Sequence, residues 1–460
     1  MTSLDKNEQD ELAENPVGPE VGDDSADETP AVGVPATGRT GDYLQNYIQR
    51  LRGGEMGSLP GVTGLIVLAI VFSIAEPSFH SLFNFGNMFS EGAGTVFIAM
   101  GLVFVLLLGE IDLAAGYTAG VCAAVMVRLM VGYSAPWPLS IGSALVSGLI
   151  IGLVVGWLRA KVRIPSFIVT LAFFLAFQGV MLYIVNNFKG QKGDITITSN
   201  VVNDFANNQM PVWAGWTLGA IIIVAYAVTK IGAVVSRQRQ GLSGEPAPVY
   251  AAKIAALAVV TLVVIWLLSK NRALNSKPII ENVNGKFVTV TPSAVEGVPY
   301  VVPVLVVLFA VWTFMLSRTR YGRHLYAVGG NEEAARRAGI PVDRIRISVF
   351  VLSGLMAAIG GIMIGSNVSS VSVANYGGNT LLLAVGAAVI GGTSLFGGKG
   401  RMVDAIVGGA VVEVIYNGMA NLVQGNNGSA IQYMVTGLAL LIAAAVDALS
   451  RRRAGASGLA

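Results

Sequence analysis

The polar side chains that interrupt apolar runs are the residues of this sequence whose types and spacing could do chemistry. Glu413, Asn417 and Asn421 recur at every fourth position, and on a helix this spacing places them in one stripe about 12 Å long. Such a stripe either hydrogen-bonds neighbouring helices together or lines a water-filled path. The charged Glu413 favours a path for a polar solute, and interhelical bonding is the alternative.

A second group of polar residues stands in "LGEIDLAAGYTAG", where Glu110 and Asp112 end an apolar run. Carboxylates at membrane depth are costly and often functional, so both are candidates to line a path. The simpler role for Asp112 is to cap a helix that begins at Leu113. A third group, Phe173, Phe177 and Gln178, follows one face of "LAFFLAFQGV". It is a further candidate lining of the path, with core packing as the alternative.

The glycines and lysine of "GGTSLFGGKGR", residues 391–401, invite comparison with a phosphate-binding loop. Thr393 occupies the first glycine position of that motif, and Gly400 stands where Ser or Thr is required, so we expect no ATP site. The segment instead repeats a spacing found earlier in the chain. Gly109, Leu113 and Gly116 are spaced as Gly391, Leu395 and Gly398 are, which suggests an internal repeat of the kind found in transporters.

Other catalytic and binding classes find no support in the sequence. No hydrolytic triad, dinucleotide fingerprint or basic stripe with interleaved aromatic residues is present, and no His or Cys cluster has metal-ligand spacing. We therefore predict neither catalytic residues nor a metal site, and no binding of nucleic acid.

The elements that must position these residues are membrane-spanning helices. The chain of 460 residues is 53% hydrophobic and 12% charged, about half the charge of an ordinary soluble domain. A spanning helix needs about 20 apolar residues. With neighbouring Gly, Ser and Thr, twelve apolar runs reach or approach that length, and these runs are 61–79, 96–108, 113–126, 139–158, 167–185, 213–228, 251–268, 301–316, 349–364, 381–390, 405–416 and 431–446. The fold class predicted is an all-α polytopic membrane protein with about twelve spans.

Charge predicts the orientation of these spans. Positively charged residues near span ends collect on the cytoplasmic side. All clusters but one fall inside if twelve spans leave both termini in the cytoplasm; the exception is the loop 270–297, which must then face outside. Residues 1–45 begin with ten acids against one lysine in the first 30 positions and should be a disordered cytoplasmic tail. Residues 449–460 form a basic cytoplasmic tail after the membrane domain, 46–448.

A short charged helix is predicted in the loop 317–346, between two apolar runs. Asn331 is a good N-cap, Glu332 and Glu333 suit the first turn, Arg336 and Arg337 suit the last, and Gly339 ends the helix. Two turns are too few to be stable alone. Ala334, Ala335 and Ala338 insert poorly into lipid, so we expect an alanine face that fits a shallow pocket of a protein partner.

At these residues the chain resembles a known family. "EAARRAG", Glu333–Gly339, resembles the EAA-type coupling loop of ATP-binding-cassette importer permeases. "GEIDLAAG" resembles the G-x-I-D-L-S/A-x-G element of their monosaccharide group, and "YAVGGNEEAARRAGIPVDRIR" and "GGTSLFGGKGR" resemble the same group. The resemblance covers about residues 60–448. It departs from the family where Glu110 replaces the usual glycine before the isoleucine.

The resemblance implies a fold related to the cobalamin-type permeases: a ten-helix core, here enlarged as in xylose-type members by an inserted helix pair and external loop at 212–297. It also implies a non-enzymatic subunit of a bacterial plasma-membrane sugar importer. Two permease copies would join two cytosolic ATPases, which bind ATP and Mg, and an extracytoplasmic sugar-binding protein. Residues 331–339 would contact the ATPase. A branched-chain amino-acid permease and an ion-coupled secondary transporter are the alternative functions.

Overall fold

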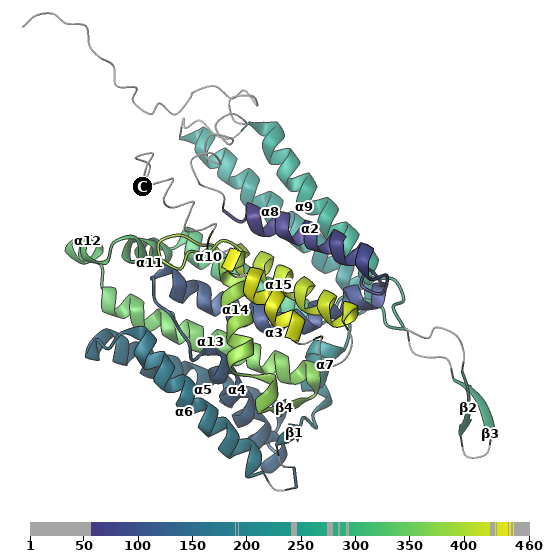
Figure 1. Cartoon of the computed structure of the whole chain (residues 1–460). Helices are drawn as coiled ribbons and strands as arrows, with labels where there is room; N and C mark the ends of the chain where they lie inside the picture. The colour runs from purple at the N-terminus through teal and green to yellow at the C-terminus, as the bar shows by residue number, and fades with distance from the viewer. Residues whose placement is uncertain are drawn as a thin grey trace, which may run out of the picture.

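The computed structural model of the chain is a bundle of long helices (Figure 1). It describes residues 57–445, apart from short gaps at 189, 192, 241–245, 274–278, 284–285, 291–293, 424–427, 429, 440 and 443–444. The predicted acidic tail 1–45 and basic tail 449–460 lie outside the described residues.

The helical prediction is confirmed, because ten helices in the described part of the chain are long and apolar enough to cross a membrane. They are α3 (Leu82–Leu107), α4 (Ala115–Val127) continued by η1 (Arg128–Gly132), α5 (Trp137–Trp157) continued by η2 (Leu158–Val162), α6 (Ser166–Asn186), α8 (Val212–Arg239), α9 (Ala247–Leu268), α10 (Val301–Arg318), α13 (Val342–Val368), α14 (Gly378–Ile390) preceded by η3 (Val373–Asn375), and α15 (Met402–Leu422).

Two further apolar helices, α2 (Leu59–Ala75) and Ala430–Ala439, are shorter than these ten. They coincide with the first and last apolar runs of the sequence, so every run corresponds to a helix. The figure of twelve spans stays a prediction, since these two do not reach spanning length within the described residues.

Helix α13 lies at the centre of the bundle and packs against α3, α4 and α5. Small residues permit this packing, because a Cβ atom added at Gly148 on α5 would overlap the backbone carbonyl of Gly354 on α13. Helix α3 is buried along its second half, with every residue from Val96 to Leu107 shielded from solvent. Helices α3 and α13 therefore form the interior of the bundle.

Helices α8 and α9 pack mainly against each other at the side of the bundle. Only 6% and 11% of their apolar windows are buried, against 89% for α3. Their peripheral place fits the expected inserted pair, although their status as an insertion stays a prediction.

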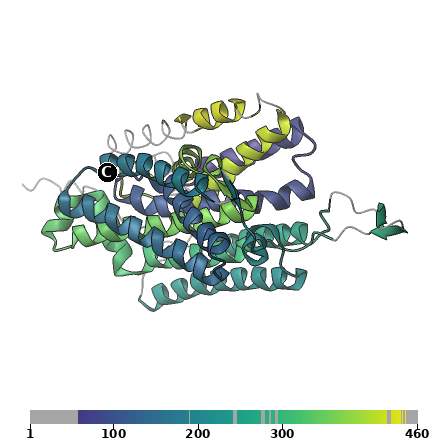
Figure 2. The ribbon, with the colours of Figure 1, turned by 90° about the horizontal axis from the view of Figure 1, so that it is seen from below.

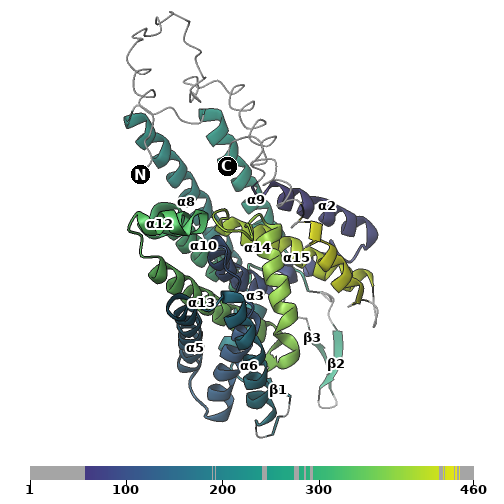
Figure 3. The ribbon, with the colours of Figure 1, turned by 60° about the vertical axis from the view of Figure 1, so that its left-hand side comes forward.

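The short elements gather at opposite ends of the bundle. Helices α11 (Arg320–Gly330) and α12 (Glu332–Arg337) lie at one end, whereas the β2–β3 hairpin projects from the other (Figures 1 and 2). The hairpin pairs β2 (Ile279–Val283) with β3 (Lys286–Val290) in antiparallel register. Helix α7 (Asn200–Asn207) and the β1–β4 pair (Asp194–Thr196 with Ser370–Ser372) also lie away from α12 (Figure 1), as Figure 3 shows again for β1. Thus α12 and the loop between α9 and α10 are on opposite sides, as the predicted topology requires.

Candidate functional site: the junction at helix α12

Three glycine-rich segments that are far apart in the sequence meet directly before α12. The backbone N–H of Gly398 donates to the carbonyl oxygen of Leu107 at 2.9 Å, which joins the loop after α14 to the end of α3. Gly329, at the end of α11, lies against the same carbonyl, and a Cβ atom there would overlap it. Gly109 has a φ of +71°, a left-handed conformation that favours glycine. Backbones can approach this closely only where side chains are absent.

The two segments with repeated spacing thus lie at one end of the bundle. Helices α3 and α14 end at Leu107 and Ile390, and the segments that follow them touch at Gly398. This is the arrangement expected if both apolar runs travel in the same direction. The internal repeat itself stays a prediction.

The loop 391–401 is organised by a carboxylate. Asp404, in the first turn of α15, accepts hydrogen bonds from the Thr393 hydroxyl at 3.2 Å and from the Arg401 backbone N–H at 2.7 Å. Lys399 is exposed. The loop is held against α3 by the bond from Gly398 to Leu107, and against α11 by the Tyr326 hydroxyl, which donates to the Gly400 carbonyl oxygen at 2.7 Å.

Helix α12 has the caps that its sequence predicts. The Asn331 side chain accepts a hydrogen bond from the Ala334 backbone N–H at 2.9 Å, and Gly339 follows the helix with a φ of +79°. Arg337, in the last turn of α12, forms an ion pair with Glu333 in the first turn. These interactions fix the two ends of a helix that is too short to persist alone.

The alanine face of α12 corrects the sequence analysis. Ala335 is 4% exposed and packs against Val328 and Val342 of the same chain, whereas Ala334 and Ala338 are exposed. The side chain of Ala335 therefore holds α12 onto the bundle and is not available to a partner. The physical reason is that one face of a two-turn helix must be covered, and here the chain covers it itself. The outer surface of α12 consists of Asn331, Glu333, Ala334, Arg337, Ala338 and Gly339.

A network of ion pairs, buried at Glu110 and Arg346 and half-exposed at Glu332 and Arg336, connects α12 to the loop between α3 and α4. Glu110 is 6% exposed, and its Oε1 lies 2.8 Å from Nη2 of Arg159. The same oxygen lies 2.9 Å from Nε of Arg346, close enough for an ion pair but not aligned for a hydrogen bond. Nη2 of Arg346 then donates to Glu332 at 2.8 Å, and Arg336 donates to the other oxygen of Glu332 at 2.9 Å. One arginine, Arg346, thus bridges α12 and the α3–α4 loop.

This network changes the role expected of Glu110. The sequence analysis placed Glu110 among residues lining a path, but its carboxylate is occupied by two arginines beside α12. A buried carboxylate that stays ionised is stabilised by neighbouring cations, and Arg159 and Arg346 provide them for Glu110. Arg346, in the second turn of α13, was missed as a partner, although an arginine buried near the start of an apolar span is itself a signal of a counter-ion.

The charges around Glu332 keep it ionised. Burial by itself would raise the pKa of Glu332, but hydrogen bonds from Arg346 and Arg336, together with their charges, hold that pKa below its ordinary value. A polar hollow of about 470 Å³ lies beside this carboxylate, lined by Arg159, Ala160, Arg163, Glu332, Arg336, Asp343 and Arg346. On its rim Lys161 pairs with Asp343 at 3.0 Å.

Asp112 acts near the start of α4, but not as its N-cap. The helix begins at Ala115 and not at Leu113, and Asp112 accepts a hydrogen bond from the Ala114 backbone N–H at 3.0 Å. The other oxygen of Asp112 accepts from the Ser353 hydroxyl of α13 at 2.7 Å. Both oxygens are therefore used to join the helix entry to the central helix.

The stripe on α15 forms a polar seam with α3. The Asn84 side chain donates to Oδ1 of Asn417 at 2.6 Å, and Asn421 donates to the same oxygen at 3.0 Å. Asn417 donates in turn to Glu91 at 3.4 Å. Asn417 and Glu413 are buried, whereas Glu91 is exposed. The hydrogen bonds across two helices are those of the interhelical alternative, and the path role stays a prediction. Asn84 and Glu91 were missed because their partners are more than 300 positions away.

The aromatic group on α6 lies apart from both polar clusters in the fold. The rings of Phe173 and Phe177 are 5.1 Å apart and, with Phe174, pack at the edge of the main hydrophobic core. Gln178 is half-buried on the same helix. This arrangement agrees with the alternative of core packing. A role of Phe173, Phe177 and Gln178 in lining a path stays a prediction.

Comparisons with known proteins agree with this geometry. Residues 84–444 match the family described as branched-chain amino acid transport system / permease component. The chain is 33% identical over 393 residues to the xylose transport system permease protein XylH of Escherichia coli K12, covering 85% of this chain and 92% of the relative. It is 31% identical over 395 residues to XylH of Haemophilus influenzae (85% and 96% covered) and 28% identical over 383 residues to the ribose import permease protein RbsC of Escherichia coli K12 (83% and 91%). No solved structure matches the chain. The chain is a multi-pass membrane protein that belongs to this permease family, in the xylose and ribose group of ATP-binding-cassette permeases.

Proposed function

We propose that the chain is the permease subunit of an ATP-driven importer that carries a monosaccharide, xylose or a similar pentose or hexose, across the plasma membrane of a bacterium. The substrate is delivered by an extracytoplasmic binding protein, and a separate cytosolic ATPase hydrolyses ATP with Mg. The chain pairs with a second permease copy, and both of its termini are cytoplasmic. The relatives named for xylose and ribose support the sugar over the branched-chain amino acid that the family description carries.

The observation that carries the proposal is the attachment of α12. The residues of its outer surface are exposed, its inner face is packed on Val328 and Val342, and Arg346 links its Glu332 to Glu110 in the α3–α4 loop. A push on the outer surface by an ATPase is thereby passed to the glycine junction between α3, α11 and the loop after α14. Rigid attachment is what such transmission requires, because a loosely held helix would move without moving the bundle.

We propose that the solute path borders the seam of α3 and α15. Glu91 reaches the surface there, and Glu413 and Asn417 stand directly behind it. One carboxyl oxygen of Glu413 has no hydrogen-bond partner within the described part of the chain, so it can accept a hydrogen bond from a sugar hydroxyl group. Asp112, Phe173, Phe177, Gln178 and Asn421 are further path candidates on α6, α15 and the entry to α4.

Deletion of the gene in its own bacterium tests the function. We expect loss of radiolabelled xylose or ribose uptake and unchanged leucine uptake, with recovery when the gene is restored. Loss of leucine uptake alone would instead support the branched-chain alternative. Uptake that stops with a protonophore while cellular ATP is held constant would support an ion-coupled secondary transporter.

Cysteine labelling tests the orientation. In a Cys122→Ala background, a cysteine at Arg336 or Lys399 should react only after the membrane is permeabilised, whereas one at Asn284 should react in intact cells. Labelling of position 336 from outside would overturn the proposed sidedness.

A further inference from the structure

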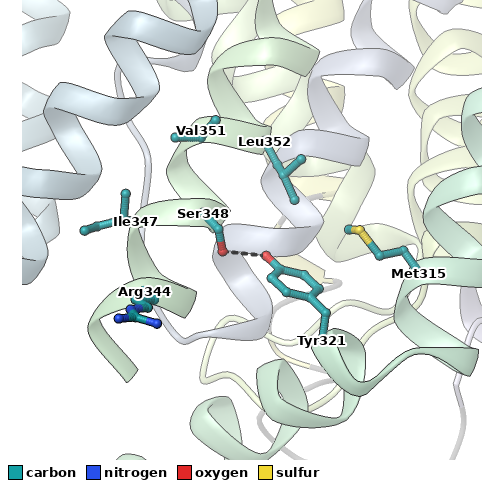
Figure 4. Close-up of a pocket in the computed structure, with 7 residues that line it drawn as sticks. All are labelled: Met315, Tyr321, Arg344, Ile347, Ser348, Val351 and Leu352. Atoms are coloured by element: carbon teal, nitrogen blue, oxygen red, sulfur yellow. Dashed lines mark hydrogen bonds between the residues drawn. The ribbon is translucent and has the colours of Figure 1, made fainter. Parts of the chain in front are cut away.

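A groove on the side of the bundle has a different chemistry from the sites above. It lies between α10, α11 and α13 and has a volume of about 480 Å³, within the range of small-molecule sites (Figure 4). Met315 of α10 and Ile347, Val351 and Leu352 of α13 form its apolar walls. No acidic side chain lines it among the residues that the structure describes.

The groove lies at one end of the membrane-spanning segments. Helix α10 ends at Arg318 and α13 begins at Val342, and α11 and α12 connect them at the same end. Leu352 therefore lies deeper in the spanning segment than Arg344, by about 12 Å of helix rise. A ligand in the groove would have an apolar portion beside Val351 and Leu352 and a polar portion near Arg344.

The polar groups of the groove stand at its shallow end. The hydroxyl groups of Tyr321 and Ser348 are hydrogen-bonded at 2.9 Å, and Figure 4 shows the Tyr321 ring directed from α11 toward α13. Burial raises the pKa of Tyr321 to about 12, although the bond to Ser348 opposes this, so the phenol keeps its proton. Arg344 is exposed one helical turn before Ser348 and has no acidic partner in the described part of the chain.

The neighbouring acids are already engaged elsewhere. Asp343 pairs with Lys161, and Glu332 pairs with Arg336 and Arg346. Three more exposed arginines, Arg318 at the end of α10 and Arg320 and Arg323 in α11, lie at the same end of the bundle. The mouth of an apolar groove thus has a positive charge at Arg344, with three more arginines at the same end of the bundle and no acidic partner for any of them among the described residues.

We propose that this groove binds an anionic phospholipid, with its phosphate at Arg344 and one acyl chain along Met315, Val351 and Leu352. A neutral sugar would leave the apolar walls without a matching surface. A free phosphate would use Arg344 alone and would not need the walls. Basic pockets between spanning helices are suited to anionic headgroups because charge and hydrocarbon are matched separately. The inference does not depend on which solute the chain transports.

The test uses the full chain purified in detergent and depleted of lipid. Phosphatidylglycerol, phosphatidylcholine with the same acyl chains, and inorganic phosphate are added separately, and Tm and the apparent lipid affinity are measured. We expect phosphatidylglycerol to raise Tm more than phosphatidylcholine, and inorganic phosphate to have no effect. The Arg344→Gln variant should lose this selectivity, with affinity for phosphatidylglycerol roughly fivefold lower, as one basic residue near an anionic headgroup contributes about 1 kcal/mol.

A matched variant separates the groove from general charge attraction. Arg239, exposed at the end of α8, lies on a different helix pair, so Arg239→Gln should keep the selective gain in Tm. Ser348→Ala should reduce the gain by removing one hydroxyl group without altering charge. Equal stabilisation by both lipids, an equal loss in Arg239→Gln, or a gain with inorganic phosphate alone would overturn the proposal. So would a gain that appears only with increasing protein concentration, because a second copy of the chain would then fill the groove.

Discussion

Two buried polar networks hold this apolar bundle together, and they differ in how their charge is balanced. At α12, the carboxylates Glu110 and Glu332 alternate with Arg159, Arg346 and Arg336, so each negative charge has a positive neighbour. In the seam of α3 and α15, two carboxylates stand among amides with no cation, and an oxygen of Glu413 is unpartnered in the described part of the chain.

The difference indicates that the two networks have different functions. A network in which every carboxylate has a cation has a single low-energy arrangement, since removing Arg346 from its buried centre leaves the buried Glu110 with less compensation, and it is suited to transmit position. A seam with spare acceptors can exchange one hydrogen bond for another at small cost, and it is suited to contact a polar solute. The predictions that follow test this contrast, from the largest expected effect to the smallest.

Replacement of the bridging arginine should have the largest effect. Arg346→Met leaves Glu110 with one cation and removes the pair between Arg346 and Glu332. Breaking a buried ion pair lowers the free energy of unfolding by about 3–5 kcal/mol. We expect a large fall in Tm of the purified chain, whereas Arg336→Met, at a half-exposed pair, should cost less than about 1 kcal/mol. In the Arg346→Met background, Glu110→Gln should restore part of the loss, as a double-mutant cycle would show. Equal falls in Tm for both arginines would contradict a network centred on Arg346.

Changes at the end of α12 should affect transport more than stability. Gly339 has a φ of +79°, which costs a β-branched residue about 1–2 kcal/mol or more, so Gly339→Val should displace the end of the helix. Ala338→Asp places a charge on the outer surface without disturbing the packed face. Both variants should abolish sugar uptake and reduce ATPase co-purification while the chain still inserts into the membrane.

Ala335→Asp is the control for the two substitutions on the outer surface. It buries a charge against Val328 and Val342, so it should lower Tm more than either of them. Normal uptake in both Ala338→Asp and Gly339→Val would end the coupling interpretation of α12.

The seam should show a separable effect on uptake. Asn417→Leu removes hydrogen bonds to Asn84, Glu91 and Asn421, with an expected cost of about 1–3 kcal/mol. Asn421→Leu removes only the hydrogen bonds that Asn421 donates to Asn417, so it should destabilise the protein less than Asn417→Leu. Both should lower uptake while the complex remains assembled and its ATPase active. If uptake is unchanged while Tm falls, the seam serves only to bond the two helices.

The smallest effect should be a dependence on pH at Glu332. Its folded-state pKa lies below the ordinary value of 4.5, so ionised Glu332 contributes stability that is present above that value and lost as pH falls through the folded pKa. Glu332→Gln should therefore change Tm by a constant amount from about pH 8 to pH 5, and the difference from the parent chain should shrink below about pH 4. A difference that grows on acidification would contradict the assigned pairing.

Features that depend on neighbours in sequence were accessible from the sequence alone. Apolar length predicted the helices, because crossing a membrane demands a local run of residues. Asn331 and Gly339 bounded α12, because caps bond to backbone groups within one helical turn. Family motifs carried the permease assignment.

Only the tertiary structure decided which of these residues touch. Glu110 was assigned to a path because the sequence shows a carboxylate next to an apolar run but does not show which cation pairs with it. That cation, Arg346, lies more than 200 positions away on α13. The burial of Ala335 could not be predicted, since two helical turns carry too little periodicity to show which face is covered. Asn84 and Glu91 were missed because hydrogen bonds between helices depend on the rotation and depth of each helix. Those are set by the packing of α3, α13 and α15 together, which no local pattern encodes.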